Sequence, residues 1–85
     1  MKILTRDSSR GCVFRVQGAS RVNAENLKLL VATIQTMYDE ANASYTIGDN
    51  TSFTVTYIFR IRDLTKERRA TIQQGVEQLI KRRFG

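Results

Sequence analysis

A strand–strand–helix pattern occurs twice within 85 residues, and this repetition is the feature that most constrains the fold. In the first copy, residues 2–5 and 12–17 have the composition of strands, and a turn at 6–11 separates them. A helix follows over about 23–41, where apolar residues recur at three- and four-residue spacing. The first half of the chain is therefore predicted to be a hairpin followed by a helix.

The second copy repeats the order. Residues 44–47 and 53–62 read as strands around a turn at 48–52, and a helix follows over about 65–84. Both turns are rich in Gly, Ser, Asn and Asp, which tolerate tight-turn dihedrals or bond their own backbone. No proline interrupts any of these segments.

Both predicted helices begin in the same way. An apolar residue precedes an N-cap, Asn23 in the first helix and Thr65 in the second, and a Glu follows two residues later. The two N-caps lie 42 residues apart, a spacing that is consistent with an internal duplication. The alternative is that two hairpin–helix units of this length resemble each other without common origin.

These elements predict one α+β domain over residues 1–85, with candidate hairpin–helix units at 1–42 and 43–85. We expect a small antiparallel sheet of three to four strands with two helices packed on one face, a ββαββα pseudo-repeat. A chain of this length has room for only one small core.

The chain contains one cysteine, Cys12, and no histidine. A disulfide within the chain, His/Cys zinc sites and Ser–His–Asp triads are therefore unavailable, and we expect neither an enzyme nor a cofactor or metal. An unpaired cysteine is typical of a reducing compartment, so the predicted location is the cytoplasm, or the host cytoplasm for a phage protein. Neither a signal peptide nor a bilayer-spanning apolar run is predicted, and no membrane or small-molecule partner is expected.

The net charge of +6 is unevenly distributed. Residues 1–22 and 51–85 are strongly basic, whereas residues 23–50 carry four acidic groups and one basic group. Segregation of this kind affects association with charged partners rather than the fold.

Alternation along the long second strand predicts which side chains face the helices. Five apolar residues share one phase, and the opposite phase is mainly hydroxyls and guanidiniums. The phase expected to pack under the helices contains Phe53, Val55, Tyr57, Phe59 and Ile61. The phase expected on the open face contains Thr54, Thr56, Ile58, Arg60 and Arg62, joined from residues 12–17 by Arg15 and Gln17.

The predicted function is binding of nucleic acid through its backbone phosphates. The candidate contact residues are cations of the open face and of the strand–helix junction, with Arg6 and Arg10 as an extension. They are Arg15, Arg60, Arg62, Lys66, Arg68 and Arg69. Because the aromatic residues fall on the buried phase, we expect little base stacking and weak sequence preference. The Gly- and aromatic-rich signature of RNA-recognition motifs and the GxxG loop of KH domains are missing, so no family is assigned.

Two alternatives remain open. The same basic surface suits an adaptor or inhibitor of the phage or mobile-element type that docks on an acidic protein surface. The edge of residues 2–5 is a candidate for strand addition, and a homodimer is a candidate assembly. The other alternative is that the positive charges only keep a structural protein soluble and unaggregated.

Overall fold

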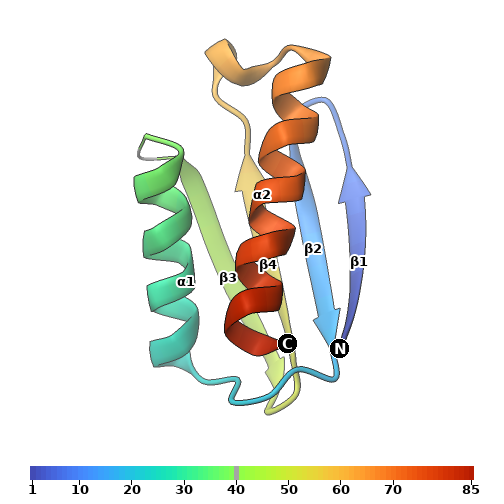
Figure 1. Ribbon diagram of the computed structural model, residues 1–85, viewed down its shortest axis with the longest axis vertical. Coiled ribbons are helices and arrows are strands. Elements are labelled where there is room, and N and C mark those ends of the chain that lie inside the picture. Colours follow the sequence, from blue (N-terminus) through green and yellow to red (C-terminus); the bar gives the residue numbers. More distant parts are fainter. Residues whose placement is uncertain (40) are drawn as a thin grey trace.

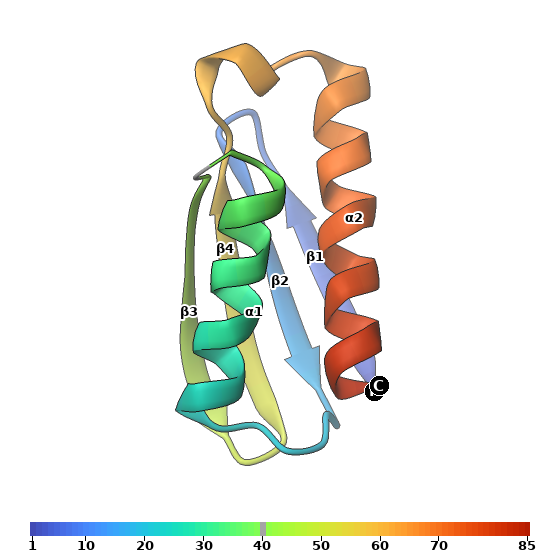
Figure 2. The same ribbon diagram turned by 60° about the vertical axis from the view of Figure 1, so that its left-hand side comes forward.

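The computed structural model describes residues 1–39 and 41–85 and shows an α+β domain. Four antiparallel strands form one sheet in the order β1-β2-β4-β3, and both helices lie on the same face of it (Figures 1 and 2). This confirms the predicted fold class and the ββαββα order. The elements are β1 (Lys2–Asp7), β2 (Gly11–Gln17), α1 (Ala24–Met37), β3 (Asn42–Asp49), β4 (Ser52–Ile58), the 3-10 turn η1 (Ile61–Asp63) and α2 (Lys66–Phe84).

The two hairpin–helix halves are interleaved rather than placed side by side as separate bodies. The two inner strands, β2 and β4, come from different halves and pair along their whole lengths. Helix α1 packs over β3, the outer strand of the second half. Helix α2 reaches β1 in the first half, where Thr5 donates a hydrogen bond of 2.8 Å to Glu77 Oε1. The halves therefore share one hydrophobic core.

The core lies between the sheet and the helices, and strand alternation fills it as predicted. Phe14 of β2 stands opposite Val55 of β4, and both side chains are 0% exposed. Phe53 and Tyr57 share this inward phase and are buried too. The helices contribute residues of their apolar stripes, including Leu27, Leu30, Ile34, Ile72, Val76 and Ile80. Removing these surfaces from water supplies the main driving force for folding.

The predicted strand over 53–62 is too long. Strand β4 ends at Ile58, where its last partners are Gly11 of β2 and Asn42 of β3. One further bond, from Phe59 N to Arg10 O at 2.8 Å, extends beyond it. Beyond this point neither β2 nor β3 offers a further partner, and the chain turns through η1 to the helix layer. Ile61, expected in the core, is consequently 90% exposed.

The first helix is shorter than predicted. Asn23 caps its start as expected, with its side-chain oxygen accepting from Asn26 N at 2.8 Å. The helix ends at Met37, and Asp39 adopts a left-handed φ of 58°. Met37, the last residue of the helix, is 56% exposed, whereas Tyr38 turns inward and is buried.

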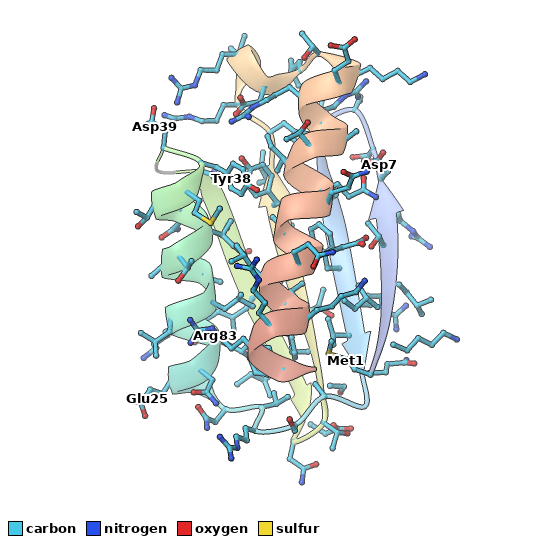
Figure 3. All side chains as sticks on the ribbon, viewed as in Figure 1. Met1, Asp7, Glu25, Tyr38, Asp39 and Arg83 are labelled. Carbon is cyan, nitrogen blue, oxygen red and sulfur yellow. The ribbon has the colours of Figure 1, made fainter. Side chains whose placement is uncertain are left out.

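Helix α2 has the predicted cap, since Thr65 Oγ1 accepts from Arg68 N at 3.2 Å. Its glycine, Gly75, makes room for one ring at the end of α1. Tyr38 lies between α1 and α2, and its phenol oxygen occupies the space next to Gly75 (Figure 3). Neither described helix is both long and apolar enough to cross a membrane.

Candidate functional site

The face of the sheet opposite the helices is covered by no other layer of the described chain (Figure 2). Strand register assigns alternate residues to it, since directly opposed residues share a face. We call this set the open face. It consists of Lys2, Leu4 and Arg6 from β1, Val13, Arg15 and Gln17 from β2, Ser52, Thr54, Thr56 and Ile58 from β4, and Asn42, Ser44, Thr46 and Asp49 from β3.

The open face carries three positive charges and one negative charge, that of Asp49, which is opposite Ser52 at the end of β3. Lys2, Arg6 and Arg15 are exposed, and Arg15 stands directly opposite Leu4, midway between the other two. None of the three makes an ion pair with a carboxylate of residues 1–39 or 41–85. Asp7, the one acid of β1, pairs with Cys12 and belongs to the helix side of the sheet. The face therefore presents a positive potential to solvent.

Hydroxyl groups form a band beside these cations. Thr54 is opposite both Arg15 on β2 and Thr46 on β3, and Ser44 is opposite Thr56. Such hydroxyls donate to anionic oxygens and accept from donors. The apolar members of the open face are aliphatic, and none of its described members is aromatic. Phe14, Phe53 and Tyr57 of the two inner strands lie on the opposite, buried side of the sheet.

Two predicted contact residues, Arg60 and Arg62, do not lie on the open face. They follow the end of β4, and both bind Asp39 at the end of α1, which Figure 3 places at the upper end of the molecule. Arg60 Nη1 is 3.8 Å from Asp39 Oδ2 and also donates to the Asp39 carbonyl, while Arg62 Nη2 donates to Oδ2. The hydrogen bond and charge of Arg62 lower the pKa of Asp39. This carboxylate partly neutralises both arginines.

Arg68 of α2 lies over the junction of η1 and α2, and its side chain is 44% exposed. Its Nε donates to Asp63 Oδ1 at 3.3 Å, and its guanidinium carbon lies 5.8 Å from the centroid of the Tyr38 ring. The Asp63 side chain is only 7% exposed, so Arg68 compensates a carboxylate that has lost most of its water. The position of Arg68 indicates a structural role at the junction of η1 and α2.

Lys66 and Arg69 form a third group. They line a groove of about 340 Å³ between the first turns of α2 and the β1–β2 turn, together with Asp7, Ser8, Ala70, Gln73 and Gln74. The six predicted contact residues therefore fall into separate places. Arg15 is on the open face, Lys66 and Arg69 are at this groove, Arg60 and Arg62 bind Asp39, and Arg68 binds Asp63.

Sequence reasoning missed Lys2 and placed Arg6 in a turn. Arg6 belongs to the open face because β1 extends to Asp7 rather than ending at Thr5, and Lys2 belongs to it because Lys2 shares the phase of Leu4 and Arg6. The signal was present in the alternation of Ile3 and Thr5 with Lys2, Leu4 and Arg6. Extension of this alternation through Asp7 would have identified a strand with two cations on one face.

The described residues contain no group of three or more His, Cys, Asp or Glu arranged to hold a metal ion. Cys12 is a free cysteine with 1% exposure. Burial, aided by the nearby carboxylates of Asp7 and Glu77, raises the pKa of its thiol to about 12. It therefore behaves as a small core residue rather than as a nucleophile.

No protein-family model, no curated protein and no solved structure matches this chain. The assignment of a function therefore depends on the geometry and charge of the chain itself.

Proposed function

We propose that this chain is a non-catalytic module that binds nucleic acid through its phosphate backbone, with the open face as the contact surface. The observation that carries the proposal is the charge of that face. Lys2, Arg6 and Arg15 lie on one uncovered sheet surface, beside hydroxyl groups, and the one carboxylate among its described members, Asp49, lies at the end of the outer strand β3, away from β1. Phosphate neutralisation by such cations releases counterions and favours binding to any sequence.

The spacing of the cations suits an extended polyanion. Lys2 and Arg6 are four residues apart on β1, which corresponds to about 13 Å at the rise of an antiparallel strand. Arg15 lies between them on β2. Three well-separated cations engage separate phosphates rather than one small anion. Lys66 and Arg69, at the groove beside the β1–β2 turn, extend the positive surface toward the η1 end of the molecule.

We expect contacts with the bases to contribute little to recognition of the nucleic acid sequence. The open face offers Thr54, Thr56, Gln17 and neighbouring polar groups to sugar and phosphate oxygens, but no described aromatic ring for stacking. We propose a cytoplasmic location, in keeping with the unpaired Cys12.

The test is binding of labelled single- and double-stranded RNA and DNA, measured by fluorescence anisotropy across a salt series. With about three phosphates engaged, log K should fall against log salt with a slope near −2.7 for duplex DNA. Arg15→Glu should weaken binding about tenfold and reduce the slope by about one. Lys28→Glu is the matched control. It makes the same change of charge, and Lys28 is an exposed residue of α1, in the helix layer away from the open face.

Equal effects of Arg15→Glu and Lys28→Glu would show that only net charge matters and would overturn the open face as the contact surface. Failure of the wild-type chain to bind any of the four probes at about 50 mM salt, where screening is weak, would overturn nucleic acid as the ligand.

A second candidate function is docking on an acidic protein surface, and one observation favours it. Ile61 is 90% exposed in η1, between Arg60 and Arg62, and Leu64 beside it is 44% exposed. An exposed aliphatic residue surrounded by arginines is a composition found at protein interfaces. Ile61→Ser should abolish binding to such a partner and leave the affinity for nucleic acid unchanged, which separates the two functions.

A further inference from the structure

The open face contains a hollow of about 330 Å³ at the end of the sheet where the β1–β2 turn lies. Its walls are Val13 of β2 and Thr56 and Ile58 of β4, all members of the open face, and its rim is Ser8 and Arg10 of the turn. We call this site the hollow. Ligand pockets measure about 300–1,000 Å³, so a volume at the lower end suits a single ring system.

Gly11 lines the hollow without a side chain. It is opposite Ile58, so its position belongs to the same side of the sheet as the walls. A Cβ at Gly11 would collide with the backbone carbonyl of Tyr57. The close approach of β2 and β4 therefore requires glycine here, and the backbone between the walls stays uncovered.

The rim of the hollow is held in place by backbone hydrogen bonds. Ser8 Oγ accepts from Gly11 N at 3.2 Å and from Arg10 N at 3.3 Å. On the other side, Phe59 N donates to the Arg10 carbonyl at 2.8 Å. The backbone that carries the Arg10 side chain is thus ordered before any ligand arrives, which lowers the entropic cost of binding.

The hollow combines apolar walls with cations. Ile58 is 48% exposed, and Arg10 lines the hollow while Arg6 is opposite Val13 on β1. Neither arginine makes an ion pair with a carboxylate of residues 1–39 or 41–85. No described residue that lines the hollow is acidic. An apolar ring joined to anionic groups complements this arrangement.

We propose that the hollow holds one unpaired base of a single-stranded nucleic acid, while Arg6 and Arg10 bind the phosphates next to it. This inference rests on the proposed function and adds the class of nucleic acid to it. A base in a duplex is paired and stacked, and its entry into the hollow would cost both interactions. The hollow therefore adds affinity only for single strands.

The position of the hollow suits a nucleotide whose backbone runs along β1. Neighbouring strands lie about 4.8 Å apart, so a site between β2 and β4 is about 7 Å from β1. A backbone bound by Arg6 can turn one base across β2 into the hollow. Arg10 can then place its planar guanidinium against the base, as arginines do in other single-strand sites.

The hollow does not distinguish the four bases. Its walls are aliphatic or carry a hydroxyl, and the hydroxyls of Ser8 and Thr56 both donate and accept hydrogen bonds. The weak sequence preference expected for the open face is therefore retained, while an unpaired base of any kind adds to the affinity.

The experiment compares two labelled single strands of equal length by fluorescence anisotropy across a salt series. One is an oligothymidylate, and the other has the same phosphates but no base on any sugar. Their salt slopes should agree, and the oligothymidylate should bind about tenfold more tightly. Equal affinities would overturn the hollow as a base site and leave phosphate binding intact. Failure of both strands to bind would overturn the proposed function as well.

Ile58→Ser removes the largest apolar wall. It should weaken binding of the oligothymidylate about fivefold and change neither the salt slope nor the affinity for the strand without bases. Leu4→Ser is the matched control, because Leu4 is 42% exposed on the same face but does not line the hollow. It should leave both affinities unchanged, and circular dichroism verifies that both variants are folded.

A loss that Ile58→Ser causes equally for both strands, or that Leu4→Ser reproduces, would overturn the assignment of the site. The comparison of the two strands on the wild-type chain decides the question even if Ile58→Ser does not fold.

Discussion

The phenol oxygen of Tyr38 occupies the space that a side chain at position 75 would need. A Cβ on Gly75 would collide with this oxygen and come within 3.3 Å of the ring carbon that bears it. Tyr38 is 8% exposed and packs edge-on against Tyr57 at 5.9 Å between ring centroids, so it has little freedom to move aside. The end of α1 and the middle of α2 are thus fitted to each other through one pair of residues.

Gly75→Ala should therefore destabilise the protein although alanine is the better helix former. The gain in helix propensity is about 1 kcal/mol, and overpacking costs about 1–3 kcal/mol. We expect a net loss of about 1 kcal/mol in urea unfolding. Adding Tyr38→Phe removes the clashing oxygen and should restore the stability of Tyr38→Phe alone to within about 0.5 kcal/mol. If Gly75→Ala stabilises the chain, the contact does not restrict this position.

Tyr57→Phe should raise stability. The Tyr57 hydroxyl is buried and has no hydrogen-bond partner among the described residues. Because an unsatisfied buried hydroxyl costs about 1–3 kcal/mol, its removal should increase the free energy of unfolding by about 1 kcal/mol. Thermal unfolding followed by circular dichroism measures the change. Tyr45→Phe, at a half-buried position, serves as the control and should be nearly neutral. A loss of stability in Tyr57→Phe would mean that its hydroxyl is satisfied.

Arg68→Ala and Arg69→Ala should differ sharply although the residues are adjacent. Arg68 compensates the buried Asp63 carboxylate, whereas Arg69 lines an open groove. Removal of one partner of a buried pair leaves an uncompensated charge. Because the Arg68 side chain is 44% exposed, we expect a loss of only about 2 kcal/mol, against less than about 0.5 kcal/mol for Arg69. Similar unfolding midpoints for the two variants would contradict this structural role.

Asp39→Asn should strengthen binding of nucleic acid. The substitution removes the charge that binds Arg60 and Arg62, and asparagine tolerates the left-handed φ of 58° at this position. Two released guanidiniums add to the positive surface, so affinity should rise about threefold at low salt, with a steeper salt dependence. Stability should change little because exposed ion pairs contribute about 0–1 kcal/mol. Unchanged affinity would show that these arginines do not contact the ligand.

Alkaline pH should unfold the protein through two buried groups. Burial, followed by the negative charges of Asp7 and Glu77, raises the pKa of Cys12 from 9.0 to about 12. Burial, followed by Asp63, raises the pKa of Tyr57 from 10.0 to about 12. Between the ordinary values and about 12 only the unfolded chain releases these protons, so stability falls as pH rises from about 9 to about 12.

Urea unfolding at a series of pH values measures this slope, and Cys12→Ala provides the comparison. The variant should lose the part of the slope that begins near pH 9 and keep the part due to Tyr57. A free energy of unfolding that stays constant from about pH 8 to about pH 11 in the wild-type chain would contradict the raised pKa values.

Local sequence patterns predicted much of this fold. The alternation of Phe53, Val55 and Tyr57 fixed which face of β4 is buried, and Asn23 and Thr65 marked the two helix starts. These features depend on residues a few positions apart, because strand side chains alternate with a period of two and an N-cap bonds within its own first turn. Arg15 was assigned correctly to the open face for the same reason.

The positions of Arg60, Arg62 and Arg68 could not be predicted from local patterns. Those of Arg60 and Arg62 depend on residues distant in the sequence, and that of Arg68 depends on a turn that strand alternation does not predict. Strand β4 ends where its neighbours end, which removed Arg60 and Arg62 from the open face and brought them to Asp39, more than twenty residues earlier. Arg68, although exposed, bonds Asp63, which is buried in η1.

The sequence by itself determined the class of each element, the buried phase of its strands and the excess of positive charge. Only the tertiary structure decided which cations share a surface and which strands lie at the edges of the sheet. The order β1-β2-β4-β3 places Lys2, Arg6 and Arg15 on adjacent strands and leaves β3 at an edge. Strand order arises from the packing of segments far apart in the chain, whereas alternation and capping arise from the backbone geometry of neighbouring residues.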